Sequence, residues 1–167
     1  NNLWDVIMID EKTGILLLSH GSRLDDGEEV IKAYTEMYKK EYPEIAIEYG
    51  FMEIRKPGIP ETINKLTKDN DLEKIIVVPV FVAHGLHTKR DIPGLLGIES
   101  NFNEDDAHDH GHHHHHHGHG HGHGHHHHHH DDEEEEFEFD GEIILTDPLG
   151  VDTRVYDIIK DRISEHL

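Results

Sequence analysis

Cysteine is absent from the 167-residue sequence. This absence excludes a disulfide framework and a thiolate metal site, so imidazole and carboxylate groups must supply any metal ligands. Long apolar runs are also missing, since none approaches the roughly 20 residues of a membrane span. The first residues lack the basic, apolar and small-residue succession of a signal peptide. We therefore expect a cytoplasmic protein, compatible with a reducing compartment, that has no membrane partner.

Basic residues are scarce as well. Lys and Arg together number 15, against 36 Asp and Glu, and the formal net charge is -21. A chain this acidic is repelled by nucleic-acid phosphates and by anionic membrane surfaces, whereas it attracts cations. We therefore expect divalent metal ions, and no nucleic acid, among its partners.

One long segment is too polar to take part in a hydrophobic core. Residues 100–136 consist mainly of histidine, glycine and acidic residues. The remaining sequence is enough for about one small α/β domain. We expect an N-terminal extension at 1–13 and a single domain at 14–167, which carries a disordered low-complexity insertion at 100–136.

Two kinds of apolar pattern alternate along the rest of the chain. Short β-branched or alternating runs predict strands at 14–19, 45–51, 74–82 and 142–145; periodic apolar residues predict helices that include 30–38, 58–66 and 151–163, with a short helical turn at 91–97. Such alternation requires a parallel sheet with right-handed crossovers. The sequence therefore predicts an α/β fold with an open, mainly parallel four-stranded sheet, in the order 2-1-3-4, and helices on both faces.

Two of the expected helices carry long apolar stripes. The first stripe is Val30, Tyr34, Met37 and Tyr38, and the second is Val151, Val155, Ile158, Ile159 and Ile163. Stripes at this spacing usually form the buried face of a helix. We expect both to pack in the core rather than to bind a ligand.

Histidines follow two of the predicted strands. His20 comes directly after the first strand, and His84 and His87 come after the third. These strands are neighbours in the expected order, and open α/β sheets bind ligands at the carboxyl ends of strands where the order reverses. Because neighbouring strands lie about 4.8 Å apart, imidazoles from both loops could reach one metal ion or one substrate atom. A lone strand-end histidine more often caps a carbonyl, and either His84 or His87 could serve only to orient a ligand.

Further charged residues are expected at the same edge of the sheet. Glu53 follows the second strand, either as a pocket group or simply as a solvated charge. A set of basic residues gathers there in an otherwise acidic chain: Arg23, Arg55, Lys56, Lys89 and Arg90. A local basic rim favours an anionic substrate, particularly one with several carboxylates.

Several motifs together resemble one family of enzymes. The sequence combines GILLLSHGSR and VPVFVAHGLHTKRDIPGLLG with FMEIRKPGIP between them, DPLGVD near the end and a histidine-rich insert before the last strand. This combination resembles the short archaeal CbiX-type class II chelatases, the sirohydrochlorin cobalt and nickel chelatases. The resemblance extends from Gly14 onward, and HGxHTxxDIPG is its most specific part. It implies a chelatase-like fold, a homodimer, and ATP-independent insertion of Co(II) or Ni(II) into sirohydrochlorin for cobalamin or nickel-tetrapyrrole biosynthesis, with no organic cofactor.

The resemblance also implies roles for individual residues. In the family pattern the histidine of SHGS and the later histidine of HGxH hold the metal; here they are His20 and His87, and His20 is also the proton acceptor. The tetrapyrrole pocket is lined by Val82, Ala83, His84, Gly85, Leu86 and His87. The position before Pro57 is credited with a substrate contact and is acidic in some relatives, whereas here it is Lys56. We place Glu53 among the same pocket groups.

The residue types suit this chemistry on independent grounds. Metal insertion removes the pyrrole protons while the ion exchanges water and protein ligands for the ring nitrogens. Histidine, with an unperturbed pKa of about 6.5, serves as ligand and as base near neutral pH. Imidazole suits Co(II) and Ni(II), and a site with few protein ligands leaves positions open for transfer.

The histidine run at 108–130 supports a different hypothesis. Its glycine interruptions and acidic flanks resist regular structure, and its imidazoles are suited to bind several Ni(II) or Co(II) ions with exchangeable affinity. The protein could therefore store or deliver metal, with the domain only as a carrier. A histidine phosphatase-like transferase is a third alternative, because His-Gly follows a strand; that class has arginine before the histidine, where this chain has Ser19.

Overall fold

The computed structural model describes residues 10–99 and 136–167. The predicted N-terminal extension lies mostly outside the described residues, and so does almost all of the predicted insertion, including the histidine run. The boundaries predicted for these two segments therefore stay predictions.

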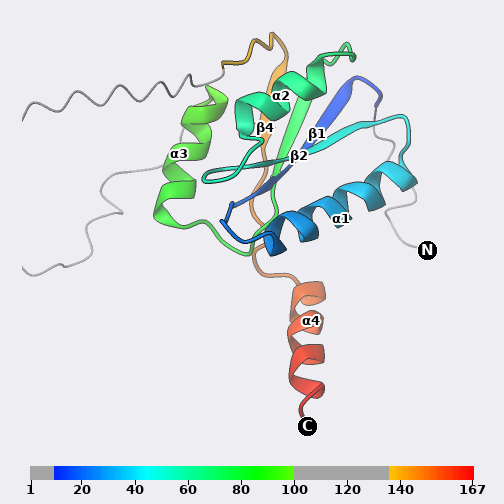
Figure 1. Ribbon diagram of the computed structural model, residues 1–167, viewed down its shortest axis with the longest axis vertical. Coiled ribbons are helices and arrows are strands. Elements are labelled where there is room, and N and C mark those ends of the chain that lie inside the picture. Colours follow the sequence, from blue (N-terminus) through cyan, green and yellow to red (C-terminus); the bar gives the residue numbers. More distant parts are fainter. Residues whose placement is uncertain (1–9, 100–135) are drawn as a thin grey trace, which may run out of the picture.

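A parallel sheet forms the centre of the described structure (Figure 1). Its strands are β1 (Thr13–Ser19), β2 (Ala46–Phe51), β3 (Lys74–Pro79) and β4 (Glu142–Leu145), and their order is β2-β1-β3-β4. Every neighbouring pair is parallel. The predicted α/β class, strand order and topology are confirmed.

Helices cover both faces of the sheet, also as predicted. The helices are α1 (Asp26–Glu41), α2 (Ile59–Thr67), α3 (Leu86–Leu96) and α4 (Thr153–Ser164). On one face α2 and α3 pack against β1 and β3; on the other, α1 packs against β1 and β2. Alternate residues of β1 point to opposite faces, so Leu16 and Leu18 join one core and Leu17 the other.

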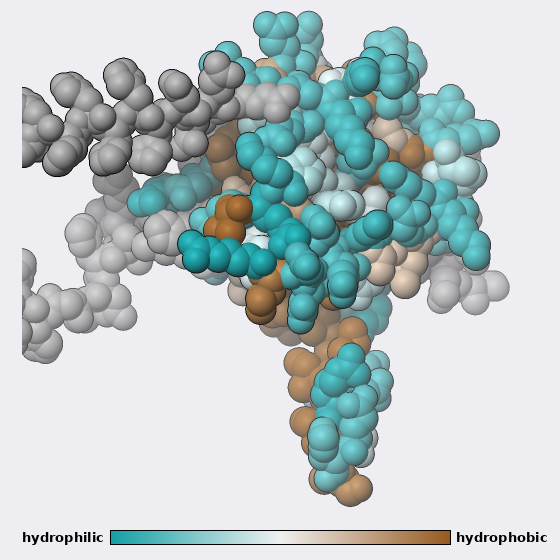
Figure 2. All heavy atoms as spheres, viewed as in Figure 1, coloured by the Kyte–Doolittle hydropathy of each residue, from teal (hydrophilic) through white to brown (hydrophobic). Residues whose placement is uncertain are grey.

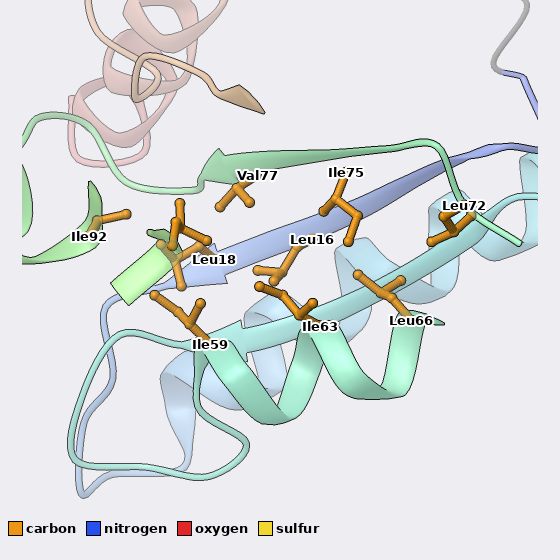
Figure 3. Close-up of a cluster of buried hydrophobic side chains, with 10 residues drawn as sticks. Leu16, Leu18, Ile59, Ile63, Leu66, Leu72, Ile75, Val77 and Ile92 are labelled. Atoms are coloured by element: carbon orange, nitrogen blue, oxygen red, sulfur yellow. The ribbon is translucent and has the colours of Figure 1, made fainter. Parts of the chain in front are cut away.

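The larger core lies between α2, α3 and the sheet (Figure 3). Ile59, Ile63 and Leu66 of α2 point at strands β1 and β3, where Leu16 and Ile75 are fully buried. Each such side chain stabilises the fold by about 1.5–3 kcal/mol relative to the same group in water. This packing holds the ends of β1 and β3, from which the candidate site extends, in fixed positions.

The third strand and the helix after it have different bounds from the predicted ones. Strand β3 ends at Pro79, three residues before the predicted end, and α3 begins at Leu86, five residues before the predicted helical turn. Pro93 lies inside α3, because burial of Ile92 and Leu96 against the sheet outweighs the hydrogen bond that proline cannot donate. His87 therefore lies in a helix rather than in a loop.

The predicted buried stripe of α1 is wrong. Tyr34 and Met37 are 44% and 62% exposed, whereas Ile31 and Thr35 are the buried residues. The buried face is narrow, and the Thr35 hydroxyl is satisfied there because it donates to the Ile31 carbonyl at 2.8 Å. A polar residue therefore occupies the core position, and the apolar stripe beside it remains in contact with solvent.

The predicted buried stripe of α4 is also wrong. The helix forms, but it contains no buried residue, and it extends away from the sheet (Figure 1). Apolar side chains line one side of this protruding helix (Figure 2). Within the described ranges, no helix is both long enough and apolar enough to cross a membrane.

Candidate functional site

The chain segments that follow β1 and β2 stay paired beyond the ends of the strands. The Met52 N–H donates to the Ser19 carbonyl at 2.9 Å, and the Glu53 N–H donates to the His20 carbonyl at 3.3 Å. Backbone groups of both loops are thereby satisfied at the carboxyl edge of the sheet. His20 and Glu53 lie side by side because their own main chains are hydrogen-bonded.

Gly21 permits this close pairing. It has a φ of 101°, a conformation that favours glycine, and a Cβ at this position would lie 1.9 Å from the Glu53 carbonyl oxygen. Any side chain would therefore force the two loops apart. The glycine of the His-Gly pair thus has a structural reason that is separate from metal chemistry.

His20 is half exposed at this edge. Its Nδ1 lies 3.7 Å from the Glu53 Oε1, which is ion-pair range but too long for a hydrogen bond. The ring is edge-on to Phe81, at 6.1 Å between centroids. A carboxylate on one side and an aromatic ring on the other limit the orientations of the imidazole. The predicted neighbourhood of His20 and Glu53 is thus present in the structure.

Phe81 also contacts His84, at 5.7 Å between ring centroids. His84 Nδ1 lies 3.0 Å from the Thr88 hydroxyl, which donates its own hydrogen to the Gly85 carbonyl. Since a hydroxyl has one hydrogen, the His84 Nδ1–H must be the donor to Thr88. The neutral ring therefore carries its lone pair on Nε2, as a metal ligand or a base requires.

The electrostatic surroundings keep His84 neutral. Burial lowers the pKa of its imidazole, Lys89 lowers it further, and Asp147 acts weakly in the opposite direction. Because the uncharged ring is favoured at neutral pH, His84 is available as a donor group there. His84, which the sequence predicts as a pocket residue, is thus neutral with a free lone pair on Nε2.

The other predicted pocket residues surround this turn. Val82, Ala83 and Gly85 are exposed, and the segment is held by the Gly150 N–H, which donates to the Val82 carbonyl at 2.8 Å. Leu86 and His87 are placed by their backbone in the first turn of α3. The structure describes no side-chain contact for these two residues, so the predicted role of His87 stays a prediction.

Lys56 is directed to a neighbouring groove. Its ammonium forms an ion pair with Glu61 of α2. Both residues line a cavity of about 450 Å³ between α2 and α3, together with Gly58, Leu95 and Phe137. A tetrapyrrole contact at Lys56 would therefore have to extend from the imidazole edge towards α2.

The predicted basic rim is partly neutralised by the protein itself. Arg55 is surrounded by acceptors from the loop after His20 and from α1, and Arg90 pairs with Asp91 at 3.0 Å. Arg23 and Lys89 are exposed and form no ion pair with another residue of the described ranges. Sequence reasoning missed the structural role of Arg55, because no local pattern shows which acceptors a long side chain will meet.

The described residues do not form a complete metal-binding site. Within residues 10–99 and 136–167, no group of three or more His, Asp or Glu side chains converges closely enough to hold an ion. The imidazoles of His20 and His84 both contact Phe81, and the Glu53 carboxylate lies beside His20.

Comparison with known proteins assigns the family. The sequence profile of the CbiX family matches residues 14–166. The chain is 48% identical over 153 residues to the sirohydrochlorin cobaltochelatase of Methanothermobacter thermautotrophicus, covering 92% of each protein. It is 46% identical over 148 residues to the sirohydrochlorin cobaltochelatase of Methanocaldococcus jannaschii, covering 89% of this chain and 95% of that protein.

A solved structure shares the fold. The crystal structure of a cobalamin (vitamin B12) biosynthesis CbiX protein from Marinobacter aquaeolei has a TM-score of 0.52 and 20% identity, covering 92% of this chain and 93% of that one. This likeness extends to the arrangement of sheet and helices. The profile match and the identities above show that the chain belongs to the CbiX family.

Proposed function

We propose that this protein is a sirohydrochlorin chelatase, an enzyme that inserts Co(II) or Ni(II) into the tetrapyrrole. Curated relatives of nearly the same length carry the name sirohydrochlorin cobaltochelatase. The observation that carries the proposal is that His20 and His84 both contact Phe81 at the carboxyl edge of the sheet, with Glu53 beside His20. In this proposal the edge supplies the base and the ligands of the reaction.

The proposed roles follow from the chemistry of the groups. His20 binds the metal and, once the ring nitrogens have displaced it from the ion, its freed lone pair accepts one pyrrole proton while the other passes to water. Glu53 lies beside His20 to hold the ring and offset its charge. His87 is the second metal ligand, and the segment from Val82 to His87 lines the tetrapyrrole pocket. Lys56 is the substrate contact towards α2. Few protein ligands leave coordination positions open, so the ring nitrogens can replace water and imidazole stepwise.

Both metals fit the donor set. Imidazole nitrogen suits Co(II) and Ni(II), and affinity for a given site rises from Co(II) to Ni(II), so cellular supply decides which ion enters. The proposed reaction uses no organic cofactor and no ATP, as the family resemblance implies. The proposed assembly is a homodimer, and the proposed location is the cytoplasm.

A spectral metallation assay tests the proposal. Purified protein, sirohydrochlorin and Co(II) or Ni(II) are mixed, and the change of the tetrapyrrole absorption spectrum is compared with the uncatalysed mixture. We expect faster metallation with the wild type, loss of turnover in His20→Ala, and normal turnover in the matched control His166→Ala, which changes an exposed histidine near the chain end. A wild-type rate equal to the uncatalysed rate would contradict the proposal.

The storage or delivery hypothesis makes the opposite prediction about the histidine run. If the run only gathers metal, deletion of residues 108–130 leaves metallation measurable and lowers the number of ions bound. If the protein is a carrier, the deletion removes metal binding altogether and no tetrapyrrole binding is found. Complete loss of turnover after the deletion would show that the histidine run itself takes part in catalysis.

A further inference from the structure

The loop after β2, residues 52–57, carries Glu53 to its place beside His20. The Phe51 N–H donates to the Pro57 carbonyl at 2.8 Å, which closes the base of this loop. Nearer its tip, the Glu53 N–H donates to the His20 carbonyl at 3.3 Å, which is longer than the usual distance of about 2.9 Å for such bonds. The position of Glu53 therefore depends on further contacts between the two loops.

The turn at Ile54 makes this placement costly. Ile54 has a φ of 68°, a left-handed conformation that β-branched residues rarely adopt, and the Arg55 N–H closes the turn on the Glu53 carbonyl at 2.7 Å. The Ile54 side chain is mostly exposed, so burial does not compensate for the strain. A strained backbone of this kind persists only where surrounding contacts fix it.

The Arg55 side chain supplies such contacts. Its Nη1 donates to the carbonyls of Ser22 at 3.2 Å and Leu24 at 3.1 Å. Its Nη2 donates to the Asp25 carboxylate, and its Nε lies 3.5 Å from the Glu28 carboxylate. All four acceptors belong to the loop after β1 or to α1. Arg55 therefore joins the β2 side of the site to the β1 side.

Asp25 contacts Arg55 instead of capping its own helix. It stands at the N-cap of α1, where an aspartate commonly accepts from the backbone N–H groups of the first turn. Its side chain makes no such bond here, and its Oδ1 accepts from the Arg55 guanidinium. The contact between the two loops is thus formed in place of a helix cap.

The Arg55 guanidinium is largely occupied by the protein. The Arg55 side chain is only 22% exposed, and each of its three nitrogens has at least one acceptor among the residues named above. The Asp25 and Glu28 carboxylates also offset its charge. A bidentate bond to a substrate carboxylate needs two parallel N–H groups, and these are already directed at the neighbouring loop.

We infer that Arg55 is a positioning residue, which acts by holding Glu53 against His20, and not a group of the basic rim that binds substrate carboxylates. The inference rests on the proposed catalysis at His20 and adds a residue to it. Without Arg55, the turn at Ile54 relaxes and the Glu53 carboxylate leaves its place 3.7 Å from the His20 Nδ1. The proposed metal ligand then loses the group that orients it.

Steady-state kinetics separate positioning from substrate binding. Arg55→Gln should lower kcat about 10- to 100-fold, as is usual for groups that orient a metal ligand, while KM for sirohydrochlorin stays nearly constant. Arg55→Lys should recover only part of the loss, because an ammonium cannot reach acceptors arranged around a planar fork. The control Lys12→Gln removes an exposed ion pair at the opposite edge of the sheet and should leave kcat unchanged. A rise in KM with constant kcat in Arg55→Gln would overturn the inference.

A change of the partner residue provides a second kinetic test. Asp25→Asn weakens the contact with Arg55 and should lower kcat by a smaller factor than Arg55→Gln does. The double variant should be no slower than Arg55→Gln alone, because both changes break the same contact. Losses that multiply in the double variant would overturn the inference. So would a lower KM with constant kcat in Asp25→Asn, since it would mean that a released Arg55 binds substrate.

Hydrogen exchange supplies a readout that needs no turnover. The Glu53 amide, which donates to the His20 carbonyl, should exchange faster in Arg55→Gln. The Val80 amide donates to the Leu18 carbonyl at 2.8 Å at the same edge of the sheet and should keep its wild-type rate. Unchanged exchange at Glu53 would overturn the inference, and equal acceleration of both amides would do so by showing a general loss of stability.

The two kinds of measurement distinguish a failed inference from a failed function. A wild type that metallates sirohydrochlorin no faster than the uncatalysed mixture would contradict the proposed function, and the catalytic part of the inference with it. The exchange rate at Glu53 would still test whether Arg55 holds the loop. Normal turnover in both the wild type and Arg55→Gln would contradict the inference alone.

Discussion

Helices α2 and α4 have the same kind of sequence pattern and opposite environments. In α2, Ile59, Ile63 and Leu66 are at most 1% exposed, whereas the isoleucines of α4 are all more than half exposed. Both helices have apolar residues at helical spacing, and both follow a strand of the same sheet. Periodicity therefore identifies the apolar face of a helix, but it does not identify what covers that face.

The largest expected difference between the two helices is in stability. Ile63→Ala should lower the free energy of unfolding by about 2–5 kcal/mol, because it leaves a cavity in the core. Ile159→Ala should cost the separated monomer less than about 0.5 kcal/mol, as is usual for a surface change. Urea unfolding of both variants, followed at several protein concentrations, measures these effects.

The concentration dependence sharpens this comparison. The loss in Ile63→Ala should be the same at every protein concentration, since its environment lies within one chain. Growth of the loss in Ile159→Ala with protein concentration would show that the proposed homodimer buries this side chain. Equal losses for the two variants at low concentration would show that α4 is already covered within its own chain.

A smaller difference is expected at the helix starts. Asp152 caps α4, since its carboxylate accepts from the Arg154 N–H at 2.9 Å and from the guanidinium, and these bonds hold the pKa of that carboxyl well below its usual range. Gly58 precedes α2 and provides no side-chain cap. Asp152→Ala should fray the first turn of α4, whereas Asp157→Ala, a change of an aspartate within the same helix, should not.

The stability that the Asp152 cap gives to α4 should fall as the pH is lowered. A carboxyl with a lowered folded-state pKa stabilises the helix fully above its unfolded pKa of about 3.9. This contribution declines as the pH falls below that value and is lost as the pH falls through the lowered folded-state pKa. Carbon chemical shifts should therefore show loss of helix in α4 below about pH 4. The shifts of α2 provide the internal reference, and equal acid fraying of both helices would contradict the assignment of the cap.

The smallest effect concerns surface ion pairs. Arg162→Gln removes the i,i+3 pair with Glu165, whose side chains are mostly exposed, and should cost about 0.2–0.5 kcal/mol. Lys65→Gln removes the contact of α2 with the partly buried Glu48 and should cost more. Thermal unfolding at low and high salt measures both, and salt should erase the first difference more completely than the second.

The sheet could be predicted from the sequence because its signals are local. Apolar runs such as Gly14–Ser19 identify the strands, and the alternation with helices requires the parallel order that the structure has. The same topology predicts that Glu53 lies on the edge adjoining His20, and the two side chains are 3.7 Å apart in the structure. The start of α3 was missed because Pro93 and Gly94 suggest a helix break, whereas buried contacts of Ile92 outweigh that local preference.

The parts that could not be predicted depend on partners distant in sequence. The tautomer of His84 depends on the Thr88 hydroxyl and on its second bond to Gly85. The role of Arg55 depends on carbonyls some 30 residues earlier in the chain. The burial of Thr35 in place of Tyr34 depends on how α1 is turned towards the sheet. None of these three features produces a periodic pattern in the sequence.

The two residues of the His20-Gly21 pair have different roles, one chemical and one structural. The Glu53 carbonyl oxygen lies close to the position that a Cβ of residue 21 would take. The backbones of the two loops are therefore packed so closely that no side chain fits between them. The histidine of the pair is the proposed reactive group, and the glycine allows the close backbone approach because it has no side chain. A substitution at Gly21 changes none of the proposed metal ligands. It should nevertheless disrupt the site, because it would separate His20 from Glu53.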